Sequence, residues 1–132
     1  MATVVTSYFK QKIAEKDINL STDNFYISLL SALTNCDCTV SAWSAVSANE
    51  ITSNNYSAAS LSGKNLLVNS CILQWDGYDI TWNNITASVS GLAVHCASDQ
   101  LVVGFIDFGA TKTAVNGNFV VQWNTAGIMN II

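Results

Sequence analysis

Apolar and β-forming residues dominate the chain in short runs, and turn residues separate these runs. Some runs alternate between apolar and polar positions, as in a strand with one buried face, and others are apolar on both faces, as in a strand inside a sheet. The predicted strands cover residues 24–33, 65–75, 78–82, 85–98, 101–108, 118–123 and 128–132. A weaker pattern at 110–115 indicates a strand nearer a sheet edge.

Three glycine positions refine this strand prediction. Asp76-Gly77 predicts a tight turn between two strands. Asn116-Gly117 predicts a hairpin, because this dipeptide suits the left-handed backbone of hairpin turns. Gly91 lies inside the strand predicted at 85–98, where a glycine often marks a bulge or a bend. The closing part of the chain is therefore expected to be a hairpin and its extension.

The N-terminal residues 3–20 predict a short amphipathic helix. Val5, Phe9 and Ile13 recur at the helical period and would face the core. The opposite face carries three of the five basic residues, at Lys10, Lys12 and Lys16. These lysines form either a solvated face or a contact with an acidic partner surface.

A second short helix is predicted in the middle of the chain, at residues 41–51. Ser41 would be its N-cap, and Trp43 and Val46 would face inward. The expected fold is mainly β: an antiparallel β-sandwich of about seven strands, with a short N-terminal helix and a short mid-chain helix. With 132 residues and no linker-like stretch, the chain is expected to form one domain, 1–132.

The composition narrows the classes of partner. Hydrophobic residues make up 50% of the chain and charged residues only 11%, and the net charge is −4. An acidic chain with five basic residues lacks the clustered Lys and Arg that nucleic acids or anionic membranes attract, so neither is expected as a partner. No apolar run is long enough to predict a transmembrane segment, and the N-terminus does not resemble an export signal.

Without an export signal, the four cysteines are expected to be reduced. Cys36 and Cys38 are two positions apart, and a zinc site that joins them to Cys71, Cys96 or His95 is an alternative. The usual two-residue spacer is absent, so no metal or cofactor is expected. The simpler interpretation makes Cys71 and Cys96 small core residues on strands, and the other two loop or strand-end thiols.

No catalytic pattern emerges from the sequence, so we do not expect an enzyme. His95 is the one histidine, and there is no G-x-S-x-G motif, phosphate loop or dinucleotide fingerprint. Asp107 lies between two apolar strand residues, where a carboxylate must be exposed at an edge or paired, and Lys112 is the candidate partner.

Four tryptophans raise a carbohydrate-binding alternative, because aromatic faces stack on sugar rings. They are Trp43, Trp75, Trp82 and Trp123. Three of them end predicted strands, where large rings close a sandwich core, and this core interpretation is preferred. An exposed ring at Trp75 or Trp43 would favour the alternative.

Several short motifs follow one another over nearly the whole chain. They are Ala48-Asn49-Glu50-Ile51 with Tyr56, Ile80-Thr81-Trp82, Ile85-Thr86-Ala87, Ile106-Asp107-Phe108-Gly109, and an ending from Gly117 through Trp123 to Met129. In this order they resemble a family of small virion proteins of tailed bacteriophages. Two features depart from that family: the short segment "CASDQ", where an extended loop is common, and the four cysteines.

The resemblance implies a capsid decoration (cement) protein that is made in the host cytoplasm, binds the outer surface of the head and stabilises the shell. It implies two partners, the major capsid protein and further copies of the chain, with a trimer as the first choice of homo-oligomer. Lys10, Lys12 and Lys16 then become the candidate contact with an acidic neighbour. The alternatives are a neck, tail or fibre component and a carbohydrate-binding module that aids host attachment.

Overall fold

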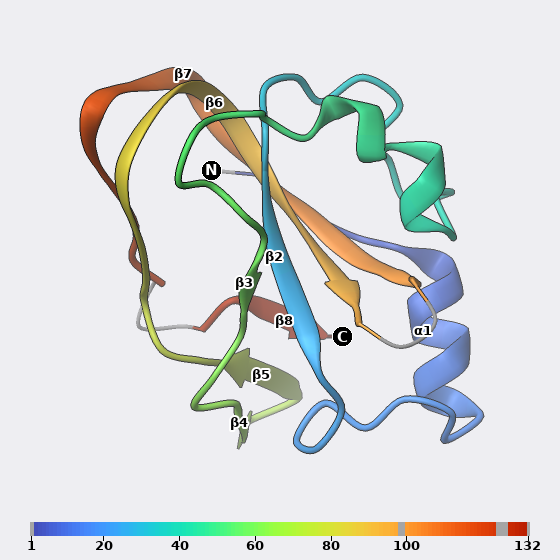
Figure 1. Ribbon diagram of the computed structural model, residues 1–132. Coiled ribbons are helices and arrows are strands. Elements are labelled where there is room, and N and C mark those ends of the chain that lie inside the picture. Colours follow the sequence, from blue (N-terminus) through green and yellow to red (C-terminus); the bar gives the residue numbers. More distant parts are fainter. Residues whose placement is uncertain (1, 98–99, 124–126, 132) are drawn as a thin grey trace.

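Two antiparallel sheets and one α-helix make up the computed structural model, which describes residues 2–97, 100–123 and 127–131 (Figure 1). The strands are β1 Ala2–Val5, β2 Phe25–Leu30, β3 Ala59–Ser60, β4 Asn65–Asn69, β5 Ile72–Asp76, β6 Ile80–Cys96, β7 Val102–Val121 and β8 Met129–Ile131. The helical segments are α1 Ser7–Ala14 and two 3-10 turns, η1 Trp43–Ala45 and η2 Ser47–Asn49. None of the described helices is long and apolar enough to cross a membrane.

The strands of the described chain form a five-stranded sheet, in the order β1-β7-β6-β2-β3, and a three-stranded sheet, in the order β4-β5-β8. Phe25 of the larger sheet and Trp75 of the smaller one meet edge to face, with ring centroids 4.9 Å apart, and both rings are fully buried. Large rings therefore close the core between the sheets. The prediction of a mainly β, antiparallel, sandwich-like fold is confirmed, and the described residues form eight strands in place of about seven.

The N-terminus begins with a strand, so the prediction of one helix over residues 3–20 is wrong in its bounds. β1 pairs with β7, from Ala2 opposite Asp107 to Val5 opposite Gly104. The helix starts only after Thr6, whose Oγ1 accepts a hydrogen bond from the Phe9 N–H as an N-cap does. Phe9 is fully buried, as its place in the helical period predicted.

The mid-chain helix predicted at 41–51 is replaced by the two 3-10 turns. Trp43 and Val46 are buried, as expected, but Ser41 is not the N-cap. Its carbonyl accepts a hydrogen bond from the Val102 N–H, and Ala42 forms a bridge with Leu101. This pairing holds the chain extended up to Ala42, so the turns begin one residue later than predicted.

The strand predicted at 65–75 is a hairpin of two strands, so that prediction is wrong. β4 and β5 pair from Asn65 opposite Asp76 to Asn69 opposite Ile72. Ser70 and Cys71 form the two-residue turn, in which Ser70 has a left-handed φ of 56°. The predicted tight turn at 76–77 instead leads from the small sheet into β6 of the large one.

β6 and β7 are one long ribbon rather than five separate strands. They pair from Ile80 opposite Val121 to His95 opposite Val102, with four register shifts. One shift lies between Val89 and Gly91, which confirms the predicted irregularity at this glycine. The last residues of two predicted strands, 98 and 132, lie outside the described residues.

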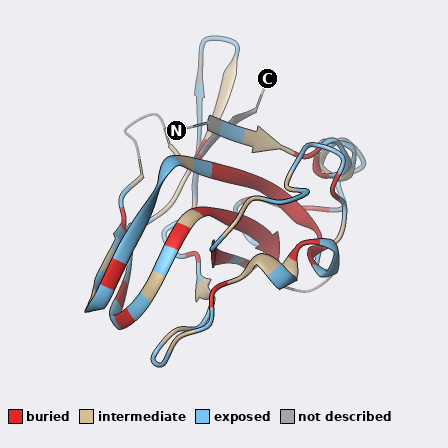
Figure 2. Ribbon diagram, turned by 90° about the horizontal axis from the view of Figure 1, so that it is seen from above, coloured by how far each residue is buried: buried red, intermediate tan, exposed pale blue. Residues whose placement is uncertain are grey.

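The hairpin predicted at Asn116-Gly117 is wrong, because β7 runs through these residues. Gly117 lies opposite Ile85, and Asn116 has a φ of 45° beside a register shift. A left-handed residue serves a bulge as well as a turn. Figure 2 shows the consequence: the ribbon is buried where it lies in the large sheet and mostly exposed where it bends away from it.

Candidate interaction surfaces

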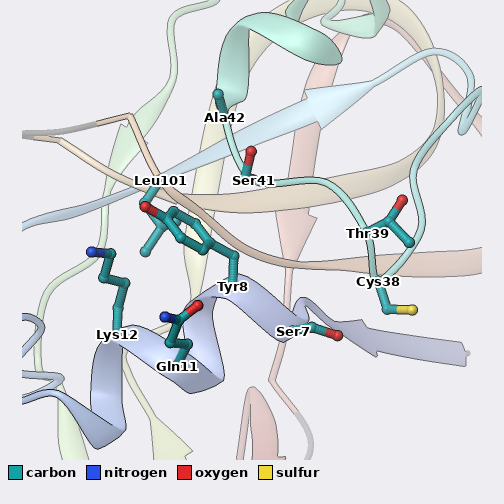
Figure 3. A pocket seen from close by; sticks show the side chains of 9 residues that line it. All are labelled: Ser7, Tyr8, Gln11, Lys12, Cys38, Thr39, Ser41, Ala42 and Leu101. Atoms are coloured by element: carbon teal, nitrogen blue, oxygen red, sulfur yellow. The ribbon is translucent and has the colours of Figure 1, made fainter.

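An open groove of about 700 Å³ runs along α1 (Figure 3). One wall comes from the helix, and the other from the segment before η1 together with Leu101, the residue before β7. The lining residues are Ser7, Tyr8, Gln11, Lys12, Cys38, Thr39, Ser41, Ala42 and Leu101. The Ser7 N–H donates to the Cys38 carbonyl at 2.9 Å and so fixes the two walls relative to each other. Hydroxyls, an amide and one ammonium line this groove, and no carboxylate does.

The three lysines predicted to contact an acidic partner have different surroundings. Lys12 forms ion pairs with Asp17, at 3.4 Å, and with Glu15, at 3.7 Å. Its hydrogen bond with Tyr8, followed by the one with Asp17, raises the pKa of Lys12. Lys10 and Lys16 are exposed. The charge of Lys12 is thus partly satisfied within the chain, and Lys10 and Lys16 remain as the basic groups that project from this region.

A second surface is the hairpin β4–β5, which projects from the body of the protein (Figure 2). β4 lies at the edge of the three-stranded sheet. Leu67 is 56% exposed and Val68 is 73% exposed. Sequence reasoning missed this surface because it treated 65–75 as one strand; the polar pair Asn69-Ser70 was the available signal for a turn.

The outer face of the β6–β7 ribbon presents a row of uncharged hydroxyls. Ser88 and Thr113 lie within hydrogen-bond distance of each other at 3.2 Å, and so do Ser90 and Thr111 at 3.3 Å. Cross-strand hydroxyl pairs of this kind stabilise a sheet by a few tenths of a kcal/mol up to about 1 kcal/mol each. These hydroxyl pairs therefore stabilise the exposed face of the ribbon without the help of ion pairs.

Beneath these surfaces lies a buried polar cluster around His95 in the large sheet. The imidazole Nε2 lies 2.9 Å from the Ser28 hydroxyl, and the ring stacks on Trp43 at 4.2 Å and 9°. Burial lowers the pKa of His95, and the nearby Glu50 opposes this shift in part. The imidazole is consequently held neutral in the folded protein at neutral pH.

Tyr56 completes the same cluster. Its hydroxyl donates to Glu50 Oε2 at 2.7 Å and accepts from the Leu29 N–H at 3.0 Å. Burial and then the hydrogen bond to Glu50 raise the pKa of Tyr56 far above its usual value. The phenol therefore remains a neutral donor throughout the physiological range.

Within the described residues, the pair formed by Ser28 and His95 is the arrangement that most suggests nucleophilic catalysis. Ser28 is 0% exposed, so a substrate does not reach its hydroxyl. Among the described residues, no carboxylate hydrogen-bonds to His95 Nδ1, where a Ser/His/Asp triad needs one. The pair satisfies two buried polar groups and does not have the geometry of an active site.

The cysteines do not come together as a metal site in the described chain, where no three His, Cys, Asp or Glu side chains form a cluster. Cys36 is partly buried and hydrogen-bonds to the Thr34 carbonyl and the Asn49 amide. Burial raises the pKa of the Cys36 thiol. Cys38 is exposed, and Cys71 is exposed at the hairpin turn rather than buried on a strand; Cys96 is buried in β6, as predicted.

The tryptophans are core residues, as the preferred interpretation predicted, and Trp43 and Trp75 are not the exposed rings that the carbohydrate-binding alternative requires. Both of these rings and Trp82 are buried, and Trp123 packs against the core. Backbone carbonyls accept the indole N–H groups of Trp75, Trp82 and Trp123. These rings do not form a stacking platform for sugars.

Asp107 is exposed, which is one of the two environments predicted for its carboxylate; the other was an ion pair. Its Oδ1 accepts a hydrogen bond from the Gly109 N–H at 2.8 Å, at the register shift of β7 between Asp107 and Lys112. In the described chain it forms no ion pair with Lys112, so the proposed partner is wrong.

Comparisons with models of protein families, with curated proteins and with solved structures found no match for this chain.

Proposed function

We propose that the chain is a structural protein of a bacteriophage virion: a decoration protein that binds the outer surface of the head and stabilises the shell. The observation that carries the proposal is the surface itself. An edge strand exposes Leu67 and Val68, and the bent ribbon presents cross-strand pairs of uncharged hydroxyls. Such surfaces suit burial against a neighbouring chain, since apolar area gains stability when it leaves water.

The order of short motifs resembling small virion proteins supports the same proposal. Those motifs lie on structural positions: Trp82 and Ile85 are in the core, and Glu50 and Tyr56 bond to each other. A decoration protein requires a stable scaffold rather than a reactive site, and these residues supply one. Many copies with weak individual contacts would together add substantial stability to a shell.

The proposed partners are the major capsid protein and other copies of the chain, with a trimer as the first choice of homo-oligomer. Lys10 and Lys16 are the proposed contacts with acidic residues of the capsid, because they are exposed, whereas Lys12 already pairs with Asp17. An attraction of this kind weakens as salt rises.

Binding of the purified chain to heads that lack it tests the proposal. The expected result is saturable co-sedimentation, with a simple ratio of bound chain to major capsid protein, and release of DNA at a higher temperature. Heads incubated with a denatured sample of the same chain are the control. Absence of binding to intact heads, together with binding to isolated tails, would move the protein to the neck, tail or fibres.

A further inference from the structure

β4 is an open strand edge that lacks the usual protection against pairing. Its five residues are Asn-Leu-Leu-Val-Asn, without a charge, a proline or an interruption in its register with β5. The other edge strands of the two described sheets are shorter than β4: β3 has two residues, β8 has three and β1 has four. Short strands and bulges are devices that prevent edge-to-edge pairing, and β4 uses neither.

The register with β5 determines which backbone groups of β4 are free to pair. Asn69 and Ile72 flank a two-residue turn, so they form a hydrogen-bonded pair. Alternate residues point their N–H and C=O groups to opposite sides of a strand. Asn65, Leu67 and Asn69 therefore bond to β5, and Leu66 and Val68 direct their backbone groups toward the open edge.

The sequence of β4 is nearly symmetric about Leu67. In an antiparallel pair with a second copy of β4, centred on this residue, Leu67 lies opposite Leu67 and Asn65 lies opposite Asn69. Leu66 of each copy lies opposite Val68 of the other copy, and these two residues carry the free backbone groups. Apolar residues therefore lie opposite apolar ones, and the hydrogen bonds form at the positions where backbone donors and acceptors are available.

The same pairing would cover exposed apolar side chains. Val68 is 73% exposed and shares a face of the hairpin with Leu66, which packs against the core. A second copy places its own Leu66 beside this valine. The hairpin projects from the body, so two molecules can approach along β4 (Figure 2).

We propose that β4 pairs with β4 of a second copy of the chain, antiparallel and with Leu67 on the two-fold axis, which joins two three-stranded sheets into one of six strands. This pairing would be one contact within the homo-oligomer of the proposed function. The biological purpose of the pairing rests on that proposed function. Alone it gives a dimer; between proposed trimers it would give a hexamer.

Sedimentation equilibrium of the purified chain, from about 10 μM to about 1 mM, tests the pairing over weak to moderate affinities. The expected mass is an even multiple of the 14.2 kDa chain. Val68→Lys should weaken association by about tenfold or more, since a lysine on an edge opposes pairing. Val115→Lys is the matched control, because Val115 is 70% exposed but lies beside a bulge of β7. A monomer throughout, or equal effects of the two variants, would overturn the proposal.

A cross-link tests the register. In a background with Cys36, Cys38 and Cys71 changed to serine, Leu67→Cys should form an intermolecular disulfide, since directly opposite residues of this kind have Cα atoms about 4.5 Å apart. Val68→Cys should not form this disulfide, because Val68 lies opposite Leu66 of the second copy and the two Val68 positions are not opposite each other. Equal cross-linking of both variants, or none, would contradict the register. Neither assay uses phage heads, so failure of head binding and failure of pairing are distinguishable.

Discussion

The rings of Trp43 and His95 stack at 4.2 Å with an angle of 9° between them, which joins η1 to the centre of the five-stranded sheet. The Ser28 hydroxyl lies 2.9 Å from the imidazole Nε2. A stacked ring with one polar contact in a buried site is a stable arrangement for neutral histidine. It is a costly one for the imidazolium, which carries a charge away from water.

Stability should therefore fall as the pH drops below about 6.5, the ordinary pKa of histidine. Below that value the unfolded chain binds a proton that the folded His95 does not, so the free energy of unfolding rises with pH in this range and His95 contributes no slope above it. Because the chain has one histidine, proton NMR can follow its imidazole directly. The native midpoint should lie below 6.5, and His95→Gln should remove this part of the pH dependence. A native midpoint at or above 6.5 would contradict this prediction.

Tyr56→Phe should destabilise the fold by about 1–3 kcal/mol, because it leaves the Leu29 N–H and Glu50 without the hydroxyl they share. Chemical unfolding measures the change. Tyr78→Phe is the control: this side chain is 69% exposed, and its replacement should change stability by less than about 0.5 kcal/mol. Similar losses in the two variants would show that the buried hydroxyl has no special role.

Gly91→Ala should destabilise the protein by about 2 kcal/mol or more, since a Cβ there would collide with the backbone carbonyl of Ile106. The obstacle is backbone of the adjacent strand, which does not move as a side chain does. Gly117→Ala, on the same ribbon, is the matched control. A Cβ at Gly117 meets nothing closer than the Val115 carbonyl at 3.6 Å. The thermal midpoints of the two variants should differ by several degrees, and coincident midpoints would count against a tight contact at Gly91.

Charge reversal at Lys10 and Lys16 together should weaken binding to phage heads by about tenfold or more and reduce its dependence on salt. The variant Lys64→Glu with Lys112→Glu has the same net charge and is the control. Binding isotherms at two salt concentrations separate the two effects. If both variants bind alike, Lys10 and Lys16 are not the contact.

The class of fold follows from local pattern, and the pairing of strands does not. The apolar and alternating runs identified most of the strand-forming residues, but not where the strands begin, end or join. Asn116-Gly117 satisfies the backbone requirement of a hairpin and of a bulge equally, and its position opposite Ile85 decides between them. At the N-terminus, the helical spacing from Val5 concealed a strand whose partner lies a hundred residues away.

The polar cluster was beyond sequence reasoning for the same reason. Ser28 and His95 are 67 positions apart, and their contact exists only because β2 and β6 are neighbours. The exposed edge of β4 was not predicted, because the turn that creates it is hard to recognise. This two-residue turn, Ser70-Cys71, lacks the glycine or asparagine-glycine signal of common hairpins. By contrast, the burial of Trp75 and Trp82 followed from their positions at strand ends.

The number of copies of this chain per virion tests the central proposal most directly. Quantitative mass spectrometry of purified virions of the kind that the proposal assigns it to, against the major capsid protein as the internal reference, gives this number. A decoration protein should be present in a ratio near one to one, or in a simple fraction of it. Absence from the particle would contradict the account, and a few copies per particle would contradict the decoration role and indicate the neck, tail or fibres.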